Sequence, residues 1–320
     1  MPIHLSRPLR GALLVVAALF MFTAGASAST PVDLRVIAPT GATLADHTQH
    51  TGTTRIKTDR NADCFGQGNE GSGKRVKVRR ATPLGAVSHG TAVERQLRPL
   101  SVTDAFDFGL GVCGIGGFDF EVTDTSFWYF KVNHANPQIG SDQVRLESGD
   151  EVLWYLTPTF ESLPAELDLE APVSAKTDQS FKVRVFQYAD DGTRSPAQGV
   201  TVTGAEEPTD ASGQTTVTLS ETGEVDASRA ADGAIPDSAR VCVAASKADC
   251  PKAEGGLIGG TPKHDNVHGT RGIDRLSTRG GADSVEAADG LADTVNCGGG
   301  KDTAEADPED RVRGCERVRT

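Results

Sequence analysis

The sequence has few aromatic side chains: Phe, Trp and Tyr make up 5% of 320 residues, and Trp occurs only twice. Aromatic side chains bury the largest apolar areas, so their scarcity argues against one large hydrophobic core. Chains of this length usually divide into domains of roughly 100 to 200 residues. We therefore expect two or three domains, each with a small core.

Common catalytic motifs are also missing. The chain contains no GxSxG elbow, no HExxH pair, no P-loop and no GxGxxG that follows a strand. It contains no CxxC pair, which weakens zinc-binding and redox interpretations. An exported hydrolase is the least favoured interpretation, because no candidate nucleophile is found. We expect a protein without catalytic activity, and we assign no organic cofactor.

Positively charged side chains are in the minority. Lys and Arg number 32 against 44 Asp and Glu, which gives a formal net charge of −12. Two of the arginines, Arg7 and Arg10, lie in the leader described next, so the mature chain carries −14. An anionic surface repels nucleic acid and anionic membranes and attracts cations. We therefore expect no nucleic acid and no membrane as a partner. The partner can be an unknown protein, a cell-envelope component or a small molecule.

Long apolar runs are absent except at the N-terminus. There Arg7 and Arg10 precede the run GALLVVAALFMFTAGA, and ASA at 26–28 has the small-x-small form of a cleavage site. A membrane anchor is the alternative, but the apolar core is short for a bilayer and a cleavage site follows it. No cysteine lies near the cut, which disfavours a lipoprotein. We expect residues 1–28 to be a signal peptide and the mature protein to be secreted, soluble and without an anchor.

All six cysteines lie after the leader. An even number in an exported protein predicts disulfides. Proximity in sequence favours the pairs Cys64–Cys113, Cys242–Cys250 and Cys297–Cys315, although six cysteines allow about fifteen connectivities.

The first unit spans residues 31–158. Residues 33–38 and 54–58 alternate with the period of a strand. Residues 82–97 have a helical pattern with Thr82 as a possible N-cap. Aromatic strands are expected at 127–133 and 150–158, and a tight turn with Gly149 at positive φ should join 143–146 to 151–154.

This aromatic segment resembles the C-terminal domain of transcobalamin and its bacterial relatives of unknown function. The shared features are a strand from Trp128 to Asn133, then Gly140, then the pair Gly149–Asp150 leading to Trp154. The resemblance covers roughly residues 55–158 and implies a small β-grasp-like sheet with one helix. In transcobalamin this domain closes over a corrinoid held mostly by a separate helical domain, which this chain does not have. Actinobacterial members imply a Cys64–Cys113 disulfide joining the segments before and after the helix.

The second unit spans residues 171–246 and precedes a linker at 247–259. Short strands at 180–188, 199–204, 215–220 and 240–245 are separated by turn residues, which predicts a β-sandwich. The segment TDASGQTTVTL at 209–219 resembles the turn-and-strand signature of bacterial Ig-like repeats, which often act as spacers.

The tail, residues 260–320, repeats an aspartate every eight to ten residues, each followed two positions later by a small or apolar residue. This pattern resembles the RTX nonapeptide GGxGxDxUx, in which the apolar U residue fills a parallel β-roll and the aspartate faces calcium. The offset of two places both side chains on one face of a strand. The resemblance implies calcium ligands at Asp265, Asp274, Asp283, Asp293 and Asp302, and a closing cap around Asp310. It also implies that calcium binding and folding are coupled.

The glycines that precede the aspartates are incomplete. Asp274, Asp283 and Asp302 keep them, whereas Asp265 and Asp293 have Lys263 and Leu291 where glycine is typical. The alternative interpretation is a β-solenoid that no longer binds calcium and is held by its Val/Leu ladder and a disulfide. We favour calcium, because stacked buried carboxylates without a ligand are electrostatically unfavourable.

Several polar and aromatic side chains are candidates for a site or for a structural role. His47 and His50 in DHTQH are expected in a solvated loop, and His134 at the end of a strand. His264 and His268 are expected in exposed loops. Trp128 and Trp154 should face the core. Tyr129, Asn133 and Tyr155 are the candidate ligand-facing residues, with a core role favoured for the aromatic ones.

Taken together, the residues predict a mainly β, multidomain, exported binding or surface-associated protein whose tail binds Ca²⁺. Its parts are a β-grasp-like α+β module, an Ig-like sandwich and a short parallel β-roll. The alternative is a capture protein for a corrinoid or another nutrient that uses the first unit.

Overall fold

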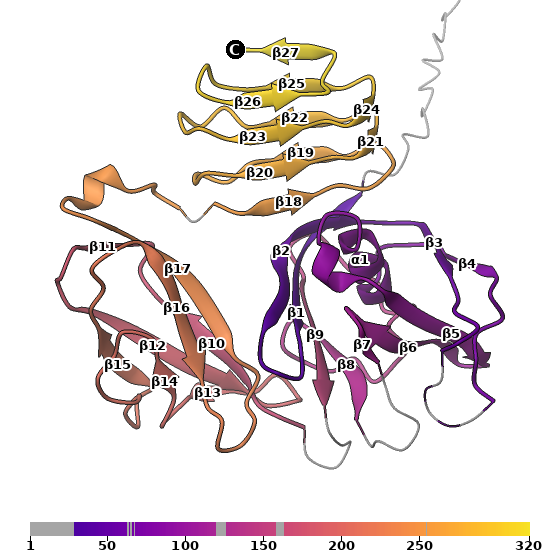
Figure 1. The fold of residues 1–320 in the computed structure, drawn as a ribbon, viewed down its shortest axis with the longest axis horizontal. Helices are drawn as coiled ribbons and strands as arrows, with labels where there is room; N and C mark the ends of the chain where they lie inside the picture. The colour runs from indigo at the N-terminus through magenta and orange to yellow at the C-terminus, as the bar shows by residue number, and fades with distance from the viewer. Residues whose placement is uncertain are drawn as a thin grey trace, which may run out of the picture.

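The computed structural model describes residues 29–62, 64, 66, 68–119, 126–157, 163–253 and 255–320. The expected leader, residues 1–28, lies outside this part of the chain. The described residues form a mainly β protein with several sheets, as predicted, arranged in three units (Figure 1).

The first unit is built on four adjacent strands in the order β2-β1-β9-β8. Strand β9 runs parallel to β1 and antiparallel to β8, while β1 and β2 are antiparallel. Smaller sheets pair β3 with β4, and β5 with β6 and β7. The elements are β1 (Thr30–Ile37), β2 (Thr43–Thr51), β3 (Thr54–Lys57), β4 (Arg75–Val78), α1 (Pro83–Gly90), η1 (Arg95–Leu97), β5 (Leu100–Phe106), β6 (Gly109–Ile115), β7 (Phe118–Asp119), β8 (Phe127–Val132) and β9 (Glu151–Thr157).

Helix α1 is shorter than the pattern at 82–97 predicts. Its start is as expected, since the Thr82 hydroxyl accepts a hydrogen bond from the Gly85 N–H at 3.0 Å. It ends at Gly90, whose Cα is so close to Leu34 and Leu97 that a Cβ would lie 3.0 Å from each side chain. The chain turns there and continues as the 3-10 helix η1.

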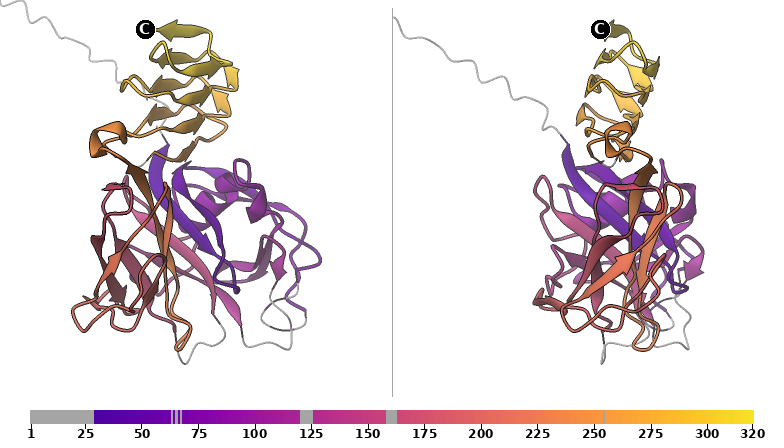
Figure 2. Two further views of the ribbon diagram at one scale, coloured as in Figure 1. Left: turned by 60° about the vertical axis from the view of Figure 1, so that its left-hand side comes forward. Right: turned by 90° about the vertical axis from the view of Figure 1, so that its left-hand side faces the viewer.

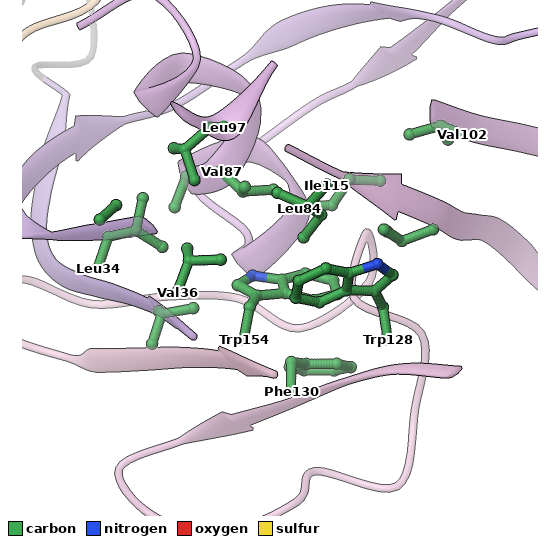
Figure 3. Packing of buried hydrophobic residues seen from close by; sticks show 14 of the residues in the cluster. Leu34, Val36, Leu84, Val87, Leu97, Val102, Ile115, Trp128, Phe130 and Trp154 are labelled. Atoms are coloured by element: carbon green, nitrogen blue, oxygen red, sulfur yellow. The ribbon is translucent and has the colours of Figure 1, made fainter. Parts of the chain in front are cut away.

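The core of the first unit lies between its main sheet and α1. Trp128 and Trp154 are 5% and 1% exposed and point toward Leu84, Val87 and Leu97 (Figure 3). The neighbouring tyrosines, Tyr129 and Tyr155, therefore point to the opposite face of the sheet, because side chains alternate along a strand. The expected inward position of the tryptophans is what the structure has.

The expected turn at Gly149 is present, with φ +84°, but the hairpin drawn from it is wrong. Residues 143–146 form no strand, and the neighbours of β9 are β1 and β8. A parallel β1–β9 pair joins residues more than 100 positions apart, which no local pattern could indicate.

The second unit consists of two four-stranded sheets around one core of mostly valine and alanine. One sheet joins β10, β12, β13 and β15, and the other joins β11, β17, β16 and β14. The strands are β10 (Glu166–Glu170), β11 (Ser174–Lys176), β12 (Phe181–Tyr188), β13 (Arg194–Pro196), β14 (Thr201–Val202), β15 (Gln214–Val217), β16 (Gly223–Ser228) and β17 (Asp237–Ala244).

The tail forms a column of coils with strands on two sides (Figures 1 and 2). One parallel ladder runs β18-β20-β23-β26, the other β19-β22-β25-β27. The small or apolar residue two positions after each aspartate is buried in five successive half-coils, from Val267 to Ala304. The strands are β18 (Leu257–Gly259), β19 (Asn266–His268), β20 (Arg275–Ser277), β21 (Gly280–Gly281), β22 (Ser284–Glu286), β23 (Thr294–Asn296), β24 (Gly299–Gly300), β25 (Thr303–Glu305), β26 (Arg311–Arg313) and β27 (Arg317–Arg319).

The first coil of the tail continues the main sheet of the first unit. Strand β18 pairs in parallel with β2, so that one eight-stranded sheet runs from β26 to β8. The buried Gln49 amide nitrogen reinforces this junction by donating to the carbonyls of Gly259 and Gly260, at 3.0 and 3.3 Å. Residues 247–259, expected to be a linker, thus contain a strand of the sheet, preceded by a short 3-10 helix, η2 (Lys247–Asp249).

This junction also corrects the prediction for the DHTQH segment. His47 and His50 do not lie in a solvated loop but in strand β2, where they are 6% and 3% exposed. His47 Nε2 lies 3.2 Å from Gln49 Oε1, and His50 Nδ1 lies 2.9 Å from Ser29 Oγ. They are buried because α1 and the tail pack against β2, a contact that the sequence does not reveal.

Three disulfides join Cys64 to Cys113, Cys242 to Cys250 and Cys297 to Cys315, the pairs expected from proximity. Three disulfides are typical of proteins that fold in an oxidising, extracellular environment. In the part of the chain that is described, no helix is long and apolar enough to cross a bilayer.

Candidate functional site

The tail aspartates lie in two columns inside the coils. Asp265, Asp283 and Asp302 precede strands of one ladder, and Asp274 and Asp293 precede strands of the other. All five are between 0% and 3% exposed, which is rare for carboxylates. Their backbone positions follow from the strand period, because the aspartate and the apolar residue two positions later share the inner face.

Each column is held by one repeated hydrogen bond. The backbone N–H of an aspartate donates to Oδ1 of the aspartate one coil later: Asp265 to Asp283 at 2.9 Å, Asp283 to Asp302 at 2.8 Å, and Asp274 to Asp293 at 2.8 Å. Asp310 and Glu316 close the two columns by accepting from Asp293 and Asp302. One oxygen of each carboxylate therefore has a structural role.

The first carboxylate of each column is fully satisfied by the protein. Thr261 donates to Asp265 through its backbone N–H (2.7 Å) and its hydroxyl (3.0 Å). Thr270 donates to Asp274 in the same way, and the Gly256 N–H donates to Asp274 Oδ1 at 2.8 Å. These two aspartates behave as buried turn-forming residues.

The next three carboxylates each keep one unpartnered oxygen. Oδ2 of Asp283, Asp293 and Asp302 is buried and accepts no hydrogen bond from the described residues. Burial, and then the charges of neighbouring aspartates, raise the pKa of Asp283, and they raise the pKa of Asp293 to about 6. A buried anionic oxygen without a partner is unfavourable, so these positions suit a bound cation or a proton.

Glycines place carbonyl oxygens next to these carboxylates. A Cβ on Gly281 would lie 2.3 Å from the carbonyl oxygen of Lys263 and 2.7 Å from Oδ1 of Asp283. A Cβ on Gly300 would lie 1.6 Å from the carbonyl oxygen of Gly281 and 3.2 Å from Oδ1 of Asp302. Backbone and carboxylate oxygens therefore converge where only glycine fits.

Within the described residues, no group of three or more His, Cys, Asp or Glu side chains is arranged to hold a metal ion. A cation in the tail would therefore need backbone carbonyl oxygens in addition to carboxylates, as hard cations accept.

The candidate ligand-facing residues of the first unit lie elsewhere. Tyr155 is 2% exposed and packs with Ile37, Leu153 and Ile235 against the second unit. Tyr129 packs on Tyr155, and its hydroxyl donates to Asp190 of the second unit at 3.3 Å. The tyrosine face is thus covered by the second unit. Asn133 is separate, because its side chain bridges the backbone N–H of Glu151 and the carboxylate of Asp150.

A charged contact joins the same two units. Glu166 on β10 is 3% exposed, accepts a hydrogen bond from Arg35 at 2.7 Å and lies 3.1 Å from Nδ1 of His134. Nε2 of His134 lies 3.1 Å from Glu151, and its ring stacks on Tyr188 at 3.6 Å between centroids. Burial by itself would lower the pKa of His134, but Glu166, aided by Glu151 and Asp168, raises it above the ordinary value.

A cavity of about 790 Å³ lies between the first two units. It is lined by the end of β1 and the following turn, by Tyr155 to Thr157 of β9, and by residues 228–236 between β16 and β17. Cavities of this size at domain interfaces are common ligand sites. The hydroxyl oxygen of Tyr155 is buried and has no hydrogen-bond partner in the part of the chain that the structure describes.

The sequence predicts one set of five calcium-binding aspartates, whereas the structure divides them into two whose carboxylates are fully hydrogen-bonded and three that keep an oxygen unpartnered by any described residue. A threonine four residues earlier marks the two satisfied members, Asp265 and Asp274, and this signal is visible in the sequence. Arg35, Gln49 and Glu166 were missed, because nothing in their local sequence indicates the partners they meet in distant segments.

A family model described as a domain of unknown function (DUF4430) matches residues 109–158. This family is associated with transcobalamin-like modules, in line with the resemblance of the aromatic strands. No curated protein matches the chain significantly. No solved structure does either.

Proposed function

We propose that this protein is an exported, non-catalytic binding or surface-associated protein whose coiled tail is stabilised by calcium. The observation that carries this proposal is the set of three buried, unpartnered carboxylate oxygens on Asp283, Asp293 and Asp302. The nine-residue spacing and the glycine turns support a degenerate RTX tail, and the second unit supports an Ig-like spacer.

The donor set fits a hard cation. Calcium is bound by six to eight oxygens from carboxylates and backbone carbonyls, typically at about 2.4 Å. Asp283 and Asp302, with the carbonyls of Lys263 and Gly281 beside them, would hold it in one column. Asp293 would contribute in the other. Asp265 and Asp274 would remain structural, because both of their oxygens are already hydrogen-bonded.

A bound cation would have an effect beyond the tail. Because β18 extends the main sheet through β2, a tail whose coils are ordered presents a rigid extension of the first unit. Calcium is abundant outside cells, so an exported protein could acquire this rigidity after export.

Calcium titration of the mature chain tests this proposal. We expect a rise in melting temperature and a gain of β-type circular dichroism at up to millimolar calcium, with magnesium less effective because it requires a tighter octahedral site. D283N/D302N should abolish the response. D226N, at an exposed aspartate on β16, should keep it.

No change in structure or melting temperature up to millimolar calcium would reduce the tail to a passive solenoid. An equal response in D283N/D302N and in the parent would show that calcium acts elsewhere.

The cavity between the first two units supports a second candidate function, capture of a small apolar molecule. The match of residues 109–158 to a transcobalamin-associated family supports the same idea, with a corrinoid as one ligand to test. Mixing with cobalamins should then change the corrin absorbance or the tryptophan fluorescence. A234W, which places a large ring in the cavity wall, should suppress the change, and the absence of any change would remove the corrinoid candidate.

A further inference from the structure

A second cavity, of about 470 Å³, lies where the first coil of the tail meets the first unit. Its walls come from the start of β1, the β2–β3 turn, residues 79–81 after β4, helix α1, residues 145–146, and the first turn of the tail at 261–264. It adjoins the first turn of one aspartate column through Thr261 and Lys263, and it shares no lining residue with the tyrosine face.

The lining of this cavity is cationic in an acidic protein. Arg79, Arg80, Arg145 and Lys263 line it together with two histidines, while the whole chain carries a net charge of −12. No carboxylate is among the described lining residues, and none of the four cations forms an ion pair with another described residue. Clustered cations repel each other unless an anion lies between them.

A buried histidine also lines the wall of this cavity, and its low pKa keeps it neutral. His89 on α1 is 4% exposed, and burial, followed by the nearby charges of Arg279 and Lys263, lowers its pKa to about 4. Its Nδ1 lies 3.2 Å from the Thr51 hydroxyl. The tautomer that accepts from Thr51 carries its proton on Nε2, which has no partner among the described residues and can donate to an anion.

One lining cation, Lys263, and one cation near the cavity, Arg279, stand at glycine positions of the repeat. Lys263 stands where the repeat pattern has glycine. Arg279, whose charge acts on His89, has φ +75°, in the left-handed region that favours glycine, and the matching residue one coil later is Gly298. A non-glycine residue in that region costs about 1 kcal/mol or more.

We propose that this cavity binds the phosphate group of a phosphate ester. Three guanidinium groups match the paired oxygens of phosphate, and a phosphate carries more charge than a single carboxylate. The cavity is larger than one phosphate group needs, so an organic group accompanies it. The source is either a free phosphorylated small molecule or a phosphodiester unit of an anionic cell-envelope polymer. Cleavage after Ala28 would add the α-ammonium group of Ser29, which also lines the cavity.

Isothermal titration of the mature chain, in calcium-free buffer at constant ionic strength, tests this site. The probes are glycerol 3-phosphate and a short poly(glycerol phosphate). We expect saturable binding that weakens at least tenfold in R79Q/R145Q. The matched control R311Q/R313Q removes the same charge from exposed positions on the last coil and should bind like the parent. R79Q/R145Q breaks no ion pair of the described residues and relieves repulsion, so it should melt no lower than the parent, and R311Q/R313Q should melt like the parent.

Tighter binding of the monomer identifies a free metabolite, and tighter binding of the polymer identifies an envelope component. The site is overturned by the absence of saturable binding to either probe, or by equal weakening in the two variants, which would indicate charge screening alone. Since calcium is absent, failure here leaves the calcium proposal untouched, and the reverse also holds.

Discussion

The backbone N–H of Asp283 donates to Oδ1 of Asp302, 19 residues later, at 2.8 Å, while Oδ2 of Asp302 is buried with no partner among the residues described. One side chain thus joins two coils and also leaves a negative oxygen inside the tail. The two oxygens make opposite contributions to stability until the second one gains a partner.

Replacing Asp302 with Asn separates these contributions. Asn keeps an oxygen that can accept the hydrogen bond from Asp283, and it removes the buried charge. In calcium-free buffer, the free energy of unfolding of D302N should therefore equal that of the parent or exceed it by roughly 1 kcal/mol. In millimolar calcium D302N should be less stable than the parent, because it lacks the carboxylate that binds calcium. Urea unfolding in both buffers measures this reversal of sign, and D226N should show none. A D302N less stable in both buffers would mean that its role is only structural.

Gly300 should tolerate no side chain. At φ +153° its Cβ would lie 1.6 Å from the Gly281 carbonyl oxygen, so G300A must displace the coil and should destabilise the tail by roughly 3 kcal/mol. Gly290 also has positive φ, +88°, but its Cβ would meet nothing within 4 Å, and G290A should lose only about 1 kcal/mol. Hydrogen exchange at residues 299–305 distinguishes the two, and equal effects would contradict the close approach.

Gln49 should anchor the tail to the first unit. Q49A removes the buried amide that donates to Gly259 and Gly260, which we expect to destabilise this junction by roughly 2 kcal/mol. Hydrogen exchange at 257–260 should accelerate, while the second unit is unaffected. Q179A, at an exposed glutamine of the second unit, serves as the control, and unchanged exchange at 257–260 in Q49A would contradict the anchoring role.

His134 should make the contact between the first two units pH-dependent. The pKa of His134 is raised in the folded protein, so its contribution is complete below the ordinary value of 6.5 and is lost as the pH rises through the raised value. The melting temperature of the parent should fall relative to H134Q as the pH is taken from about 6 to 8.5. H268Q, at an exposed histidine of the tail, should track the parent. Parallel curves for the parent and H134Q would exclude this linkage.

Much of the tail could be predicted from the sequence because its geometry is local. The distance from an aspartate to the apolar residue two positions later fixes which side chains share the inner face, and the roughly nine-residue period fixes the length of a half-coil. For similar reasons the inward tryptophans, the Gly149 turn and the start of α1 at Thr82 were predicted. Each depends on residues a few positions apart.

The end of α1 could not be predicted, because close packing of Gly90 against Leu34 determines it. The burial of His47 and His50 could not be predicted either, because it depends on elements that pack against β2. From the sequence, Tyr129 and Tyr155 could either face a ligand or belong to a core. Only the packing of the second unit against them decides what they face.

The sequence by itself determined the mainly β character, the division into small units and the rhythm of the aspartate columns. These properties follow from composition and from periods of two and nine residues. Only the tertiary structure decided which carboxylate oxygens lack partners, where the cationic cavity lies and that the tail extends the main sheet through β2. Those properties arise between segments up to about 200 positions apart, for example Gln49 and Gly259, and pairing over such distances is set by packing rather than by local pattern.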